Sequence, residues 1–175
     1  MHRRSLVTIT TIGALLVMVF AMSAGASARN DVVAQVKSVT SRFHSLAQAK
    51  AAGYVPFYVC AEQPGVGTMG QHYVNFDLVG DPAIDPLHPE ALVYEPKAGG
   101  GYRLVALEWV RVGTQQATAP TVLGRDMLYR TAPNRYGIDP GFYERHYWLY
   151  KSNPDGAFSD WNPNVSCRGK GDNGG

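Results

Sequence analysis

Glu108 is the residue in this sequence whose chemistry most needs an explanation. It lies in segment 102–112, whose β-branched and aromatic residues predict a strand. Alternation gives it neighbours on its own face that are all apolar: Leu104, Ala106, Val110 and Val112. The opposite face is also apolar, so the middle of this strand is predicted to be buried on both sides. A carboxylate there must be paired, hydrogen-bonded, protonated or bound to a metal.

Two histidines are predicted to share this buried environment. His72 and His146 lie in the strand-like segments 69–76 and 143–150, each on the face that carries bulky apolar residues. Two neutral imidazoles, one carboxylate and an open position are typical of sites for Zn²⁺, Cu²⁺, Mn²⁺ or Fe²⁺. We therefore expect His72, Glu108 and His146 to bind a divalent transition metal. Glu95 and Met69 are further candidate contributors to that site.

Three alternatives to a metal site remain open at this stage. Glu108 and a histidine could share a proton as an acid/base pair. A metal-free carrier would enclose an apolar or aromatic small molecule, with Glu95, Trp109 and Tyr147 as the expected ligand-binding residues. An envelope or partner-binding protein would use the histidines for packing alone. The sequence has no G-x-S-x-G motif and no phosphate-binding loop, which disfavours covalent hydrolysis and leaves any catalytic activity undecided.

The elements that must position these residues are one helix followed by strands. Apolar residues recur at steps of three and four over 31–52, which predicts a helix that ends at Gly53. The strand-like segments that follow are 55–61, 72–78, 91–95, 102–112 and 142–151. We expect an α+β fold in which the N-terminal helix packs on a curved, mostly antiparallel sheet or partly closed barrel. Residues 113–141 show no periodicity and are expected to pack on the core as a loop or to cover a pocket.

Residues 1–28 are typical of an export signal. Arg3 and Arg4 precede an apolar run, and Ala26-Ser27-Ala28 provides a small-x-small cleavage site. We expect cleavage before Arg29 and a secreted or extracytoplasmic location, with no membrane span left in the mature chain. Arg3 and Arg4 leave with the signal and no acidic residue does, so the remaining 14 basic residues balance the 14 acidic ones. This neutrality argues against nucleic acid as a partner.

The mature chain is predicted to be one domain held by one disulfide. Residues 29–167 suit a single α+β domain, and the glycine-rich, polar segment 168–175 is expected to be a disordered tail. Cys60 and Cys167 are the two cysteines of the chain, and in an oxidising compartment they pair most simply with each other. A thiolate metal site is the alternative, but no C-x-x-C spacing supports it. Nothing in the sequence indicates an oligomeric state.

Several short stretches carry a resemblance. They are Ala-Lys-Ala-Ala-Gly-Tyr, Met-Gly-Gln-His-Tyr-Val-Asn, Leu-Val-Tyr-Glu-Pro, His-Tyr-Trp-Leu-Tyr-Lys-Ser-Asn-Pro and Trp-Asn-Pro-Asn-Val-Ser-Cys. In these stretches the chain resembles a group of small secreted bacterial proteins of unassigned function. The resemblance extends over most of the mature chain. It implies an exported location and a single domain, and it implies no activity.

Overall fold

The computed structural model describes residues 29–169. The expected export signal, residues 1–28, and residues 170–175 of the expected tail lie outside this range. The described chain is helical over residues 29–40, continues as the short 3₁₀ helix η1 (Ser41–His44), and turns into helix α2 (Leu46–Ala51).

The single helix predicted over 31–52 is therefore divided, and local side-chain bonds explain the division. The Thr40 hydroxyl donates to the Val36 carbonyl at 2.6 Å, which is a local bond that helices tolerate poorly. The Tyr150 hydroxyl, from the C-terminal segment, forms a hydrogen bond of 2.8 Å with the same Thr40 hydroxyl. Ser45 adopts an extended backbone, and its side chain accepts from the Gln48 amide, so a new helix begins there.

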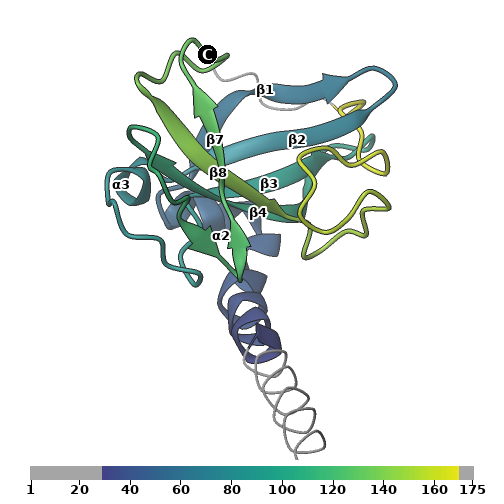
Figure 1. Cartoon of the computed structure of the whole chain (residues 1–175). Helices are drawn as coiled ribbons and strands as arrows, with labels where there is room; N and C mark the ends of the chain where they lie inside the picture. Colours follow the sequence, from purple (N-terminus) through teal and green to yellow (C-terminus); the bar gives the residue numbers. More distant parts are fainter. Residues whose placement is uncertain (1–28, 170–175) are drawn as a thin grey trace, which may run out of the picture.

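A six-stranded antiparallel sheet forms the body of the domain, in the order β1-β2-β3-β4-β8-β7. Its strands are β1 (Val55–Gln63), β2 (Gly67–Val74), β3 (Ala91–Pro96), β4 (Tyr102–Val112), β8 (Gly141–Tyr147) and β7 (Leu128–Thr131). The sheet curls into a half-barrel, so that β7 and β8 cross in front of β1 to β4 (Figure 1). The predicted α+β fold, with a helix on a curved antiparallel sheet, is confirmed.

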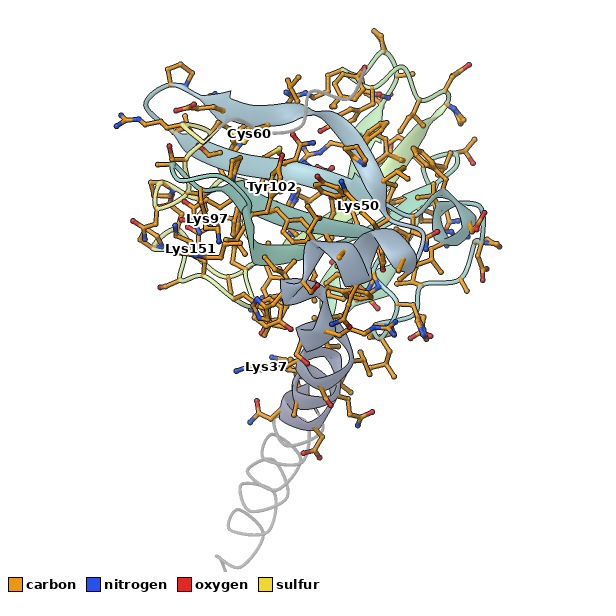
Figure 2. The ribbon with its side chains drawn as sticks, turned by 180° about the vertical axis from the view of Figure 1, so that it is seen from behind. Lys37, Lys50, Cys60, Lys97, Tyr102 and Lys151 are labelled. Atoms are coloured by element: carbon orange, nitrogen blue, oxygen red, sulfur yellow. A yellow bond between two sulfur atoms is a disulfide. The ribbon has the colours of Figure 1, made fainter. Side chains whose placement is uncertain are left out.

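The short helices η1 and α2 lie over the convex face of this sheet, while the helix that precedes them extends away from it, as the view in Figure 2 shows. Val36, Phe43 and Ala49 pack there against a large cluster of buried sheet residues that includes Tyr73, Leu92, Tyr94, Leu107 and Trp109. The Tyr94 hydroxyl donates to the Phe43 carbonyl at 2.7 Å, which ties the sheet to the end of η1. Burial of this apolar area is the main force that holds helix and sheet together.

A bulge in the β3–β4 pair changes which residues share a face. Val93 lies opposite Ala106, whereas Tyr94 lies opposite Leu104, so one residue of β4 is left over. Leu104 consequently packs in the convex-side cluster, and Val105 joins Ala106 on the concave side. Strict alternation predicted Leu104 on the face of Glu108, and the bulge makes that prediction wrong.

Residues 113–141 are more ordered than the absence of periodicity suggested. They contain the two-stranded pair β5 (Thr121–Val122) and β6 (Arg125–Asp126) and the edge strand β7. Val122, Leu123 and Met127 of this stretch are buried in the convex-side core. The remaining short helix, α3 (Phe76–Val79), follows β2 and begins at Asn75, whose side chain caps it.

A disulfide joins Cys60 of β1 to Cys167, 107 residues later, which confirms the predicted pairing. The C-terminal segment thereby wraps over one end of the sheet, where Asn162 also forms a bridge with Thr68 of β2. Lys151, which is labelled in Figure 2, belongs to this C-terminal segment. Among residues 29–169, no helix is long and apolar enough to cross a membrane.

Candidate metal centre

The curl of the sheet brings together two histidines that a flat sheet would separate. His72 lies on β2 and His146 on β8, and strands β3 and β4 stand between them. Three strand spacings in a flat sheet amount to about 14 Å. The two Nε2 atoms are instead 3.2 Å apart, because both side chains point into the concave side of the half-barrel. The site therefore depends on the curvature of the sheet.

The strand register then places Glu108 beside both imidazoles. Glu108 on β4 lies directly opposite His146 on β8. On its other side Glu108 faces Ala91 of β3, whose methyl side chain leaves the carboxylate room. His72 follows one strand further on, opposite Val93. Strands β2, β4 and β8 thus direct these three side chains toward a single point.

The distances within this group are longer than those of strong ion pairs and close to those between the ligands of one metal ion. Nε2 of His72 is 3.3 Å from Oε2 of Glu108, and Nδ1 of His146 is 3.7 Å from Oε1. A charge-assisted N–H···O bond is shorter, at about 2.7–2.9 Å. Ligand atoms about 2.0–2.2 Å from a tetrahedral Zn²⁺ stand roughly 3.3–3.6 Å from one another. Ligand atoms of the three residues all lie within 4.8 Å of each other.

All three side chains are buried, and one polar atom among them makes no hydrogen bond. The exposed fractions are 7% for His72, 5% for Glu108 and 0% for His146. Nδ1 of His146 makes no hydrogen bond to any described residue. Leaving such an atom unsatisfied costs about 1–3 kcal/mol, so a buried group of this kind calls for a ligand.

Burial and neighbouring charges set the protonation of the group. Burial lowers the pKa of His146, which favours the neutral imidazole that binds metals. Burial opposes ionisation of Glu108, but positive charge on His146 or His72, together with a hydrogen bond to His72, outweighs burial and lowers the pKa of this carboxyl to about 2. The centre therefore offers a carboxylate anion and at least one neutral ring nitrogen at neutral pH.

A second acidic group adjoins the centre, and the sequence analysis did not identify it. Glu144 and Asp160, together with His146, form another set whose ligand atoms are mutually close. Arg130 already occupies both carboxylates: its Nε donates to Glu144 at 2.5 Å, and it also pairs with Asp160. A metal would have to displace this guanidinium. The set of His72, Glu108 and His146 carries no such cation, which makes it the better metal site.

Glu144 also lies close enough to Glu108 to influence its protonation. Burial and the Glu108 charge raise the pKa of Glu144 to about 8, against the opposing effect of the Arg130 guanidinium. Two carboxylates in one buried region rarely ionise together, so the proton stays on Glu144 while Glu108 is charged. The pattern that could have revealed Glu144 is simple: it alternates with Phe142 and His146 on one strand face.

A small apolar pocket lies on the concave side above His72 and Glu108. Its other walls are Glu144 and the apolar side chains of Phe57, Val74, Phe76, Val79, Val110, Tyr136, Ile138 and Phe142. Tyr136 and Ile138 belong to residues 132–140, which we call the roof segment. The roof segment is fastened to β1, because the Tyr58 hydroxyl donates to the Arg135 carbonyl at 2.8 Å. This part of the expected covering loop does lie over a pocket.

The other residues expected to bind a ligand lie elsewhere. Glu95 is on the concave side but binds Lys151, whose Nζ lies 2.7 and 2.8 Å from its two carboxylate oxygens. Trp109 is in the convex-side core, and its indole N–H donates to the Asp85 carbonyl at 3.0 Å. Tyr147 stacks on Phe158 at a ring separation of 4.7 Å. The fold does not bring these three side chains to the centre.

Met69 lies nearer to the centre without entering it. It lines a separate cavity of about 240 Å³ together with Arg130, Glu144, Asp160 and Trp161. This cavity adjoins the apolar pocket, since Tyr136, Phe142 and Glu144 line both. Met69 therefore lies on the side of the centre where Glu144 and Asp160 are found.

Comparison of the chain with protein-family models, with curated proteins and with solved structures found no match. The functional argument therefore depends on the geometry of the half-barrel and of the buried residues His72, Glu108 and His146.

Proposed function

We propose that this protein binds one divalent transition metal ion through His72, Glu108 and His146. The observation that carries the proposal is the orphaned Nδ1 of a fully buried His146, set beside a buried carboxylate at metal-ligand spacing. Two imidazoles and one carboxylate suit Zn²⁺, Cu²⁺, Mn²⁺ or Fe²⁺, and are a poor set for Ca²⁺ or Mg²⁺, which prefer oxygen ligands. Three protein ligands leave at least one coordination position open.

The geometry favours this function over an aromatic carrier at the same place. The pocket above the centre has a volume of about 50 Å³. A cavity that binds benzene measures about 150 Å³. The aromatic residues Trp109 and Tyr147, which a carrier would use, are engaged away from this pocket.

Metal analysis of the purified chain, prepared without an affinity tag, tests the proposal. We expect about one equivalent of metal per chain, and metal at a hundred times its dissociation constant should raise the free energy of unfolding by about 2.7 kcal/mol. Titrations with Zn²⁺, Cu²⁺, Mn²⁺ and Fe²⁺, followed by thermal unfolding, identify the preferred ion. Absence of bound metal, combined with no thermal shift for any of the four ions, would refute the function.

Matched variants separate this centre from adventitious binding. Glu108→Gln and His146→Gln each remove one ligand with little change in side-chain volume, and both should abolish stoichiometric binding. His88→Gln is the control, because His88 is an exposed histidine paired with Asp85. Equal loss in all three variants, or retention of metal in the first two, would contradict the assignment.

We further propose that the protein works outside the cytosol. The expected signal over residues 1–28 and the Cys60–Cys167 disulfide both support this location, because disulfides persist in oxidising compartments. Cell fractionation is the test. Recovery of the uncleaved chain, with free thiols, from the cytosol would contradict the proposal.

A further inference from the structure

The apolar pocket indicates what kind of ligand fits the open position of the proposed metal. His72 and Glu108 line this pocket, whereas His146 lies behind them and does not. A metal held by the three side chains would therefore have its free side toward the pocket. This inference rests on the proposed function, and the walls and volume of the pocket determine which ligand could reach the metal.

The walls of the pocket disfavour a strongly hydrated ligand. Apart from His72, Glu108 and Glu144, every lining side chain is apolar or aromatic. Glu144 is engaged by Arg130, so its carboxyl group already has a cation partner. A ligand entering here exchanges water mainly for valine, isoleucine and aromatic rings, and among these walls only the Tyr136 hydroxyl and the Glu144 carboxyl could return a hydrogen bond.

The size of the pocket sets a second limit. Its volume of about 50 Å³ lies between the roughly 10–15 Å³ that one water needs and the roughly 150 Å³ of a cavity that holds benzene. The roof segment covers part of the pocket, where Tyr136 packs against Phe57 and Tyr58 with ring separations of 5.5 and 5.1 Å. A ring-shaped ligand has no room unless this packing is broken.

We propose that the open coordination position accepts a slender, weakly hydrated ligand of about two or three heavy atoms, a class that includes dioxygen, and excludes ring-sized ligands. Polar substrates such as sugars, peptides and phosphate esters are outside this class. The proposal concerns binding at the metal and specifies no reaction.

Cobalt substitution tests this selectivity directly. Co²⁺ is bound to the purified chain, and its visible spectrum reports changes in coordination. Azide, a linear anion of three atoms whose charge the metal ion neutralises, is the slender probe, and imidazole is the ring-sized probe. We expect azide to change the spectrum in a saturable manner, whereas imidazole at the same concentrations leaves it unchanged.

Two valines of β4 provide a matched pair of variants. Val110→Phe places a phenyl ring in the pocket and should weaken azide binding by about tenfold or more, while cobalt stays bound. Val112→Phe makes the same change two residues further along the strand, at a side chain that is 39% exposed, and should have no effect. In the opposite direction, Ile138→Ala enlarges the pocket and should allow imidazole to bind.

The outcomes distinguish the two proposals. If cobalt binds and azide leaves the spectrum unchanged, or if imidazole binds as well as azide, the pocket does not select the ligand and this inference is wrong. Equal effects of the two valine substitutions would also overturn it. If no cobalt binds, and none of the other four metals does, the proposed function fails and this inference fails with it.

Discussion

Glu90 provides a test of the structure that can be made on the metal-free chain. This residue precedes β3 and is 2% exposed, and its Oε2 accepts a hydrogen bond from the Val110 amide at 2.9 Å. Replacing it by glutamine keeps an oxygen that can accept the same bond but removes the ionisable group. The substitution therefore isolates the cost of burying a charge at this position.

The sign and size of the effect follow from the pKa. Burial raises the pKa of Glu90 to about 7 from 4.5, although the hydrogen bond from Val110 opposes the rise. Because the folded chain holds this proton more tightly than the unfolded chain, the free energy of unfolding decreases as the pH rises from about 4.5 to about 7. The full cost is about 3 kcal/mol, most of which develops between pH 5 and pH 9.

Urea unfolding of the wild type and of Glu90→Gln at pH 5 and pH 9 measures this cost. The free energy of unfolding that the variant gains over the wild type should be about 2–3 kcal/mol larger at pH 9 than at pH 5. Glu144, whose pKa is also raised, contributes equally to both proteins and cancels in the difference. Glu62→Gln, at an exposed position of β1, is the control and should show no such dependence. An identical pH dependence in wild type and Glu90→Gln would refute the reasoning.

Two further predictions concern the covalent link and the roof segment. Replacing both Cys60 and Cys167 by serine should lower the free energy of unfolding by about 4–5 kcal/mol, because it frees a loop of 107 residues in the unfolded chain, and a loss below about 1 kcal/mol in urea unfolding would contradict this. Tyr58→Phe removes the bond to the Arg135 carbonyl, worth about 1 kcal/mol, so metal release to a chelator should be about fivefold faster in stopped-flow measurements while the equilibrium affinity stays the same. An unchanged release rate would indicate that metal does not leave beneath the roof segment.

Alternation along single strands was sufficient to predict which side chains enter the centre. His72, Glu108 and His146 each stand among apolar neighbours of the same face, and that pattern is visible in the sequence. Their meeting at one point was not visible, because it depends on the curl that brings β2 and β8 together across two strands. Curvature is a property of the whole sheet, and no local segment encodes it.

The other errors of the sequence analysis also arise from features that appear only in the folded chain. Leu104 changes face because of a bulge, which period-two reasoning cannot foresee. The helix predicted over 31–52 is interrupted because Tyr150, more than 100 residues away, binds the Thr40 hydroxyl. Arg130 and Asp160 come from stretches without periodicity, so only their contacts in the folded chain reveal that they occupy Glu144.

The bulge in β1 affects how copies of this chain meet one another. β1 is an edge strand of the sheet, and Val55 and Val59 on it are 45% and 53% exposed, so a regular strand here would invite another chain to add on. The register of β1 shifts between Phe57 and Ala61, and Tyr58 takes a positive φ of 56°. Gln71 binds the carbonyls of Phe57 and Tyr58 from within the sheet. The row of outward donors and acceptors is thus broken in the middle, which disfavours the addition of a second copy of the chain along this edge.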